Sequence, residues 1–307
     1  MSARPILAIL HHESDEASPT PYLIGCISEE WEKLGFTVKK IYGTKKRIAA
    51  DAMIVHIDAS VVPEEYLDFA RHYPRVINVG ISDISKRTCS TNLVSQDPGY
   101  GGAVIVKTSH NSAGALELNR RRLPHKNNLL LRAYWKLFGD PAESYPYRIR
   151  SKDDYRIYNA LAEVPQEIFN CPDLVVEKFS PERVGEKYLQ RKWYFLGESE
   201  FYSCEISEKP IFTVGTYAPE RAIAPPQAIR EVRTRLKMDY GKIDYAIADG
   251  RPVLFDVNKT MGVGSPRIVY AEILAETLAT GIFAYFPELR PTPALLTEEQ
   301  AGAGISP

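Results

Sequence analysis

Apolar and polar residues alternate along the first hundred positions in the way that a parallel α/β unit requires. Short apolar runs predict buried strands, and the segments between them carry apolar residues at helical spacing. The predicted strands lie at 6–11, 36–42, 52–57 and 76–79, and the predicted helices lie at 22–34 and 63–72. This order predicts a small βαβαβ lobe with a parallel sheet.

Beyond residue 97 the pattern becomes richer in strands. Turn-forming residues at 97–102 separate the two parts. Further strands are predicted at 103–107, 174–179, 188–196 and 210–216 and in a hairpin at 243–257, and helices at 126–138, 153–162, 226–237 and 266–284. We therefore expect an α/β (α+β) protein with an N-terminal domain at 1–97, a second domain at 98–290 and a flexible tail at 291–307.

Composition excludes several partners. The 307 residues include 38 Lys and Arg against 39 Asp and Glu, so a net charge of −1 provides no global field to attract nucleic acid or a membrane surface. No segment approaches the run of about 18 apolar residues that spans a bilayer, and the apolar run at 6–10 is too short for a signal peptide. We expect a cytoplasmic protein that binds neither nucleic acid nor membrane.

Common catalytic signatures are missing from the sequence. It contains no G-x-x-x-x-G-K-[ST], no G-x-S-x-G and no H-E-x-x-H, and its four cysteines form no C-x-x-C pair. These absences exclude a P-loop nucleotidase, a serine hydrolase of the nucleophile-elbow type and the common zinc enzymes.

The clearest candidate for chemistry is an acidic hairpin. Asp256 and Asn258 are two residues apart on a predicted strand, so their side chains project from one face and their oxygens can share a hard cation such as Mg²⁺. Asp244 lies on the preceding strand. A strict two-residue turn at Asp249–Gly250 would place Asp244 on the other face, so we predict an odd loop or a bulge that sets it opposite Asp256.

Three segments resemble the ATP-grasp superfamily, and they occur in the order found there. Asp244 with Asp256-Val-Asn258 and a glycine-bearing turn is similar to its metal-binding hairpin. The strand at 104–107 with the small-residue loop at 109–114 resembles its phosphate lysine and lid, and 174–179 resembles the strand that links its two subdomains. The resemblance implies an ATP-grasp fold with subdomains at about 103–176 and 177–290, which binds ATP and Mg²⁺.

The resemblance also implies roles for individual residues. Asp244, Asp256 and Asn258 would hold metal. Arg191, or Lys192 in its place, would be a catalytic cation together with Lys107, because period-two geometry lets only one of the two neighbours face the cleft. The nucleotide contacts would come from Lys86, Lys107, Ser112, Gly114, Glu177, Lys178, Phe179 and either Glu182 or Glu186. For Lys178 and Phe179 we expect main-chain contacts and an apolar wall.

The acceptor substrate would contact the N-terminal lobe and the segment after the metal hairpin. His11 and His12 end the first predicted strand, at the sheet edge where α/β proteins bind ligands. Lys259, Ser265 and Arg267 follow the hairpin, and side chains of these types suit a carboxylate-bearing small molecule or peptide.

The implied reaction is activation of a carboxylate as an acyl phosphate and its ligation to an amine. The substrates would be a small molecule, an amino acid or a peptide, in peptide or specialised-metabolite biosynthesis, and a homodimer is possible for this superfamily. The alternatives are an ATP-grasp kinase, a nucleotide-binding scaffold without turnover and a sugar-nucleotide transferase. The kinase would share the nucleotide site, whereas the transferase would not need an acidic hairpin opposite a lysine.

Overall fold

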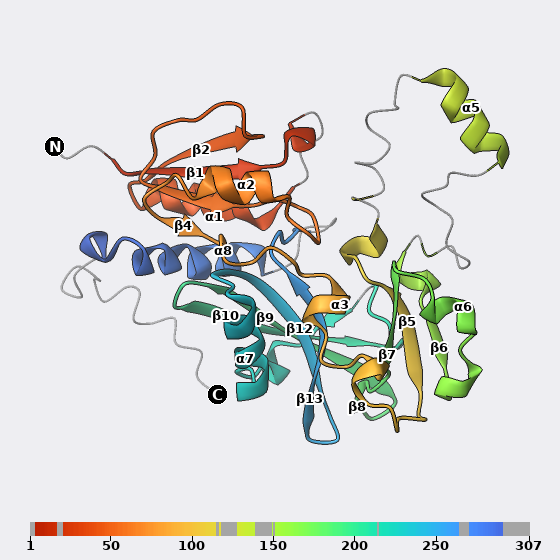
Figure 1. Ribbon diagram of the computed structural model, residues 1–307. Helices are drawn as coiled ribbons and strands as arrows, with labels where there is room; N and C mark the ends of the chain where they lie inside the picture. The colour runs from red at the N-terminus through yellow and green to blue at the C-terminus, as the bar shows by residue number, and fades with distance from the viewer. Residues whose placement is uncertain are drawn as a thin grey trace.

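Three β-sheets organise the chain in the computed structural model (Figure 1). The structure describes residues 4–16, 21–114, 117, 128–138, 149, 151–213, 215–263 and 270–290. The predicted tail at 291–307 lies outside these ranges. No helix in these ranges is long and apolar enough to cross a membrane.

The N-terminal lobe contains a four-stranded sheet in the order β2-β1-β3-β4, and every pairing in it is parallel. Its strands are β1 (Ile6–His11), β2 (Thr37–Tyr42), β3 (Ala52–Val55) and β4 (Val76–Ile77), and its helices are α1 (Leu23–Lys33) and α2 (Glu64–Ala70). Apolar residues of α1 pack on one face of the sheet and those of α2 on the other. The predicted parallel lobe is confirmed.

A six-stranded antiparallel sheet forms the centre of the molecule. Its strands are β8 (Glu182–Val184), β9 (Lys187–Leu196), β10 (Ser199–Ser207), β11 (Thr216–Tyr217), β12 (Tyr240–Ala248) and β13 (Arg251–Asn258). Helix α7 (Gln227–Leu236) packs on one face. Helix α8 (Ala271–Ala279) lies between this sheet and α1, and its buried residues join the core of the N-terminal lobe to that of the sheet (Figure 1).

The third sheet is a small antiparallel one that stands beside the first two. It consists of β6 (Arg156–Tyr158), β5 (Val104–Thr108) and β7 (Leu174–Lys178), in that order, with α6 (Gln166–Phe169) on one face. Helix α3 (Lys86–Cys89) precedes it in the chain, and α5 (Leu129–Phe138) lies apart from the sheets in Figure 1. Short 3-10 helices complete the described chain: η1 (Glu13–Asp15), η2 (Val94–Gln96), η3 (Asn111–Gly114), η6 (Lys152–Asp154), η7 (Leu161–Glu163), η8 (Pro219–Arg221), η9 (Thr280–Ala284) and η10 (Pro287–Leu289).

Two predicted elements are wrong. The helix expected at 153–162 is instead the edge strand β6 between two 3-10 turns, because its backbone pairs with β5. The strand expected at 210–216 is reduced to β11, while the missed strand β10 pairs along its full length with β9. In both places tertiary pairing overrides the local pattern.

Candidate functional site

The hairpin formed by β12 and β13 places two carboxylates side by side. Asp249 and Gly250 form a two-residue turn in which both residues have positive φ, 50° and 75°. The register then shifts between Asp244 and Tyr245, so that Asp244 is paired directly with Asp256. The predicted bulge is confirmed. It puts both carboxylates on one face, whereas the strict register would have separated them.

The small sheet supplies a lysine and a glutamate that face this hairpin. Antiparallel pairing sets Ile105 opposite Glu177 and places Lys107 two residues along on the same face. Lys107 Nζ lies 2.7 Å from Glu177 Oε2, and both side chains are buried. Lys107 Nζ also lies 5.7 Å from the ring centre of Phe255, the extra residue at the bulge.

Lys86, at the start of α3, connects the two halves of the site. Its Nζ lies 3.1 Å from Asp256 Oδ1 and donates to Asn111 Oδ1 at 3.0 Å. Asn111 in turn donates through Nδ2 to the main-chain oxygen of Val257. Burial opposes the charged form of Lys86, but the carboxylate of Asp256 outweighs burial and raises the pKa of Lys86 above its ordinary value.

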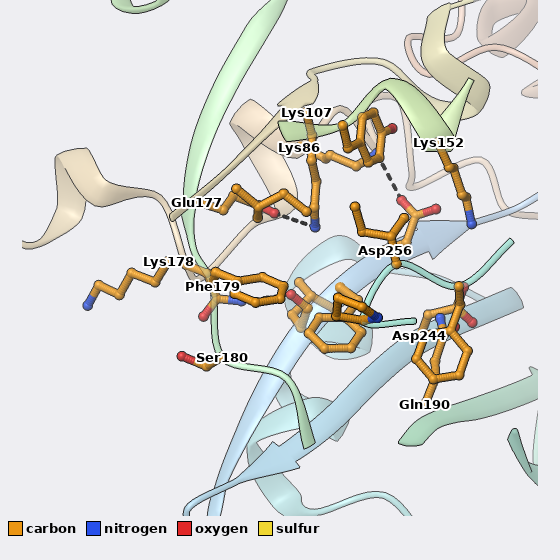
Figure 2. A pocket seen from close by; sticks show the side chains of 18 residues that line it. Lys86, Lys107, Lys152, Glu177, Lys178, Phe179, Ser180, Gln190, Asp244 and Asp256 are labelled. Atoms are coloured by element: carbon orange, nitrogen blue, oxygen red, sulfur yellow. Dashed lines mark hydrogen bonds and ion pairs between the residues drawn. The ribbon is translucent and has the colours of Figure 1, made fainter. Parts of the chain in front are cut away.

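These side chains line one cavity between the small sheet and the central sheet (Figure 2). Its charged lining residues are Lys86, Lys107, Lys152, Glu177, Lys178, Asp244 and Asp256. Its apolar wall comes from Ile105, Phe179, Ile211, Phe212, Leu254 and Phe255. An apolar slot that ends in lysines and carboxylates is suited to a flat ring joined to an anion.

Both carboxylates lie among lysines, with Asp244 buried and Asp256 partly buried. Lys242 Nζ donates to Asp244 Oδ2 at 2.9 Å. Burial would raise the pKa of Asp256, but the ammonium groups of Lys86, Lys152 and Lys242 outweigh it and hold that pKa below its ordinary value. Asp256 therefore carries negative charge at neutral pH in a strongly positive surrounding.

The donor set fits a hard cation in part. Asp244 Oδ1 is buried and accepts no hydrogen bond from the described residues. A Mg²⁺ ion bound there would give this oxygen a partner. Within the same ranges no group of three or more His, Cys, Asp or Glu residues forms a metal-binding cluster. The available set is thus two carboxylates and the amide of Asn258, whose Oδ1 accepts from the main-chain N–H of Thr260 at 2.8 Å.

Arg191 does not face the cavity, which corrects the assignment made from sequence. Its guanidinium makes two hydrogen bonds to Glu182, at 2.6 and 3.0 Å. In the register of β9 with β12, Lys192 is the residue opposite Asp244, and Arg191 is opposite Tyr245 on the other face. Lys192 pairs with Glu205.

Neither candidate for the ribose contact reaches the cavity. Glu182 is occupied by Arg191 and also accepts from the main-chain N–H of Ile247 at 2.7 Å. Glu186 is exposed in the turn between β8 and β9. Both are separated from the site because β8 pairs with the part of β9 that precedes the cleft-facing residues.

Strand β7 forms where the strand between the two subdomains was predicted, but the main-chain N–H groups at its end already donate hydrogen bonds within the protein. Lys178 and Phe179 line the cavity, yet their N–H groups donate to the main-chain oxygens of Asn92 and Ala103. The ammonium of Lys178 points away from the other labelled side chains in Figure 2 and pairs with Asp97 at 2.7 Å. The expected main-chain contacts therefore cannot come from these two N–H groups, and Phe179 remains part of the apolar wall.

The lid residues are described only in part. Gly114 is buried, with a φ of +71°, at the end of η3. It is not among the residues that line the cavity. The side chain of Ser112 lies outside the described residues.

The predicted acceptor residues are dispersed. Lys259 is buried, and its Nζ donates to the main-chain oxygens of Ile57 and Ala59, both at 2.6 Å, so it joins the lobes and is not exposed to substrate. His12 accepts from the main-chain N–H of Ser14 and stacks on Tyr66. His11 lines a different cavity, in the N-terminal lobe. Ser265 and Arg267 lie outside the described residues.

Several site residues were missed from sequence. Lys152, Tyr155 and Gln190 line the cavity, and Lys242 contacts Asp244. Lys242 had a local signal, because it stands two residues before Asp244 on the same strand face. Lys152 had no such local signal. It reaches the cavity from the 3-10 turn η6, whereas the sequence predicted a helix at 153–162.

Comparison with known proteins adds a fold-level likeness. No protein-family model matches the sequence, and no curated protein matches it. The chain aligns with solved ATP-grasp structures over most of its length. A RimK-domain ATP-grasp protein of Sphaerobacter thermophilus aligns at 12% identity and a TM-score of 0.48, covering 91% of this chain and 99% of the other.

Two further solved structures align over similar lengths. They are a D-alanine–D-alanine ligase of Bacillus anthracis complexed with ATP, at 12% identity and a TM-score of 0.46, and the macrocyclase MdnB of Microcystis aeruginosa, at 11% and 0.42. Each alignment covers 92% of this chain and 99% of the other. These TM-scores, all below 0.5, describe loose alignments.

Proposed function

We propose that this protein is an ATP-dependent ligase of the ATP-grasp type that joins a carboxylate to an amine. One observation carries the proposal: Lys86 and Lys107 face Asp244 and Asp256 across a single cavity that has an apolar wall. Lysines on one side suit phosphate oxygens, and carboxylates on the other suit the metal that accompanies a nucleotide triphosphate.

The nucleotide would enter with its base against the apolar wall. Ile105, Phe179 and Leu254 offer apolar surface to a purine ring. Lys86 and Lys107 would contact phosphate oxygens, exchanging part of their pairing with Asp256 and Glu177 for pairing with the ligand. Such an exchange keeps each buried ammonium paired throughout.

Asp244, Asp256 and Asn258 would hold Mg²⁺, with Asp244 Oδ1 as the oxygen that the fold leaves without a donor among the described residues. When bound, this ion neutralises charge on the phosphoryl oxygens. Lys192 and Lys242 are both cations on the face of the sheet that carries Asp244. Lys192 is paired with Glu205, whereas Lys242 contacts Asp244, so Lys242 would take the role that we assigned to Arg191 or Lys192.

The proposed reaction has two steps. An oxygen of the substrate carboxylate attacks the γ-phosphorus of ATP, the bond to the β-phosphate oxygen breaks, and ADP leaves with an acyl phosphate formed. The amine nitrogen then attacks the acyl carbon, the carbon–oxygen bond to phosphate breaks, and the amine loses a proton. Positioning and charge stabilisation are the main demands on the protein, so no nucleophilic side chain is needed.

Thermal unfolding with Mg²⁺ alone, ATP with EDTA, and Mg²⁺ with ATP tests the nucleotide site. At 100 times its dissociation constant a ligand stabilises by about 2.7 kcal/mol, which shifts the midpoint by several degrees. We expect the shift with Mg²⁺ and ATP together, and its loss in Asp244→Asn and Asp256→Asn. Asp249→Asn is the matched control, because it makes the same change in the exposed turn of the same hairpin, where asparagine also tolerates a positive φ.

The absence of a shift in the natural protein would overturn the proposal. A shift that survives both Asp244→Asn and Asp256→Asn would overturn the metal assignment. Product analysis then separates ligase from kinase, because an acyl phosphate is trapped by hydroxylamine as a hydroxamate, whereas a phosphorylated hydroxyl is not.

A further inference from the structure

A third lysine reaches into the cavity between the small sheet and the central sheet, beside Lys86 and Lys107. It is Lys152, which lies in η6, the turn that precedes β6. The resemblance to the ATP-grasp superfamily assigns no nucleotide contact to any residue between Gly114 and Glu177. Lys152 is therefore a cation of the site for which that resemblance does not account.

Lys152 differs from the other lysines of the cavity in its pairing. Each of the others has a carboxylate partner within 3.1 Å: Lys86 has Asp256, Lys107 has Glu177 and Lys178 has Asp97. Among the residues that the structure describes, no ion pair or hydrogen bond joins Lys152 Nζ to a carboxylate. An anionic ligand can therefore pair with this ammonium without displacing a carboxylate of the described chain.

The place of Lys152 in the cavity is the end opposite the apolar wall. Figure 2 shows its ammonium on the side of Asp256 and Asp244, whereas Phe179 lies on the other side of the cavity. The carboxylates whose charges act most strongly on Lys152 are likewise Asp256 and Asp244. These two carboxylates are the proposed ligands of Mg²⁺. A metal ion bound with ATP bridges the β- and γ-phosphates, so Lys152 lies where the γ-phosphate would be.

The turn that carries Lys152 is fixed by contacts on both sides. Ser151 and Asp154 form a capping box around it, in which the main-chain N–H of Ser151 donates to Asp154 Oδ2 at 3.0 Å. Directly after the turn, β6 pairs with β5, the strand that carries Lys107. The main chain thus holds Lys152 at the cavity. Since Lys152 itself is exposed, replacing its side chain is expected to leave the fold intact.

We propose that Lys152 binds the γ-phosphate of ATP and makes the site selective for a nucleoside triphosphate over the diphosphate. The inference rests on the proposed ligase function. An ammonium is a compact charge that suits phosphate oxygens, and ADP has no phosphoryl group to reach it. Such a contact favours release of ADP once the γ-phosphate has been transferred.

Calorimetric titration of the full chain tests this assignment, with the non-hydrolysable triphosphate analogue AMP-PNP and with ADP, each in the presence of Mg²⁺. We expect the natural protein to bind AMP-PNP more tightly than ADP. In Lys152→Gln the affinity for AMP-PNP should fall about tenfold, the loss expected for one charged hydrogen bond, and the affinity for ADP should not change. Retained binding of ADP also shows that the variant is folded.

Two further variants separate the effect of Lys152 from a general loss of positive charge. Lys187→Gln changes an exposed lysine at the start of β9, which pairs with Glu208, and should leave both affinities as they are. Lys107→Gln removes a cation on the side of the cavity nearer to Phe179. It should weaken the binding of AMP-PNP and ADP alike.

The ratio of the two affinities decides the outcome. A ratio in Lys152→Gln equal to that of the natural protein would overturn the inference, as would a natural protein that binds AMP-PNP and ADP equally tightly. Binding of neither nucleotide to the natural protein would contradict the ligase proposal itself. Selective binding that Lys152→Gln retains would contradict the γ-phosphate assignment alone.

Discussion

Lys86 Nζ lies 3.1 Å from Asp256 Oδ1, and the lysine side chain is 5% exposed. The pair connects α3, which follows the N-terminal lobe, to the last strand of the central sheet. It also means that a metal-site carboxylate has a second task, because it balances a buried ammonium.

Removing one member of this pair should destabilise the fold more than removing both. We expect Asp256→Leu to lower the free energy of unfolding by about 3–5 kcal/mol, since it leaves Lys86 buried without its counter-charge. Lys86→Met combined with Asp256→Leu should recover most of that loss while binding no nucleotide. Urea denaturation measures the stabilities, and a double variant that is less stable than Asp256→Leu would contradict this account.

Arg191 should stabilise the fold and should not contribute to nucleotide binding. Arg191→Gln disrupts a bidentate pair with Glu182 on the face of β9 that points away from the cavity, so we expect unchanged nucleotide affinity. Lys107→Gln removes a cation from the cavity and should weaken nucleotide binding about tenfold or more. Titration with a fluorescent ATP analogue compares the affinities of the two variants. An equal loss of affinity in both would mean that Arg191 takes part in nucleotide binding.

Lys259 should act as a connection between the lobes. Lys259→Met leaves the main-chain oxygens of Ile57 and Ala59 without a charged donor, and we expect a loss of about 2–3 kcal/mol in the free energy of unfolding. Amide hydrogen exchange across 57–59 should become faster. Lys45→Met, at a lysine whose side chain is 90% exposed, is the control and should change neither quantity.

Acid should destabilise the N-terminal lobe through two buried histidines. Burial lowers the pKa of His11 to about 4 and that of His56 well below its usual value. A histidine with a depressed folded pKa contributes its full stability above the unfolded pKa near 6.5, and loses it as pH falls through the folded pKa. The free energy of unfolding should therefore fall between pH 6.5 and 4, by up to about 1–2 kcal/mol per pH unit for each histidine.

Replacement of the histidines checks the origin of this slope. His11→Leu and His56→Leu should each flatten the profile, because neither variant has an imidazole that the unfolded chain can protonate. His72→Leu changes an exposed histidine and should leave the slope as it is. A slope unchanged in both buried variants would assign the acid sensitivity to other groups.

The sequence by itself determined the parallel N-terminal lobe and the acidic hairpin. Both depend on relationships within a few residues: apolar runs define buried strands, and a spacing of two puts Asp256 and Asn258 on one face. Even the bulge was predictable, because without it Asp244 would point into the apolar core on the other side of the hairpin.

Only the tertiary structure decided which side chains meet at the site. Whether Arg191 or Lys192 faces Asp244 depends on the register of β9 against β12. That register cannot be inferred from the sequence of β9 alone. The pairing of Lys86 with Asp256 joins positions 170 residues apart through packing of separate elements. Periodicity describes the faces of one element, whereas a site between elements depends on how those faces are packed together.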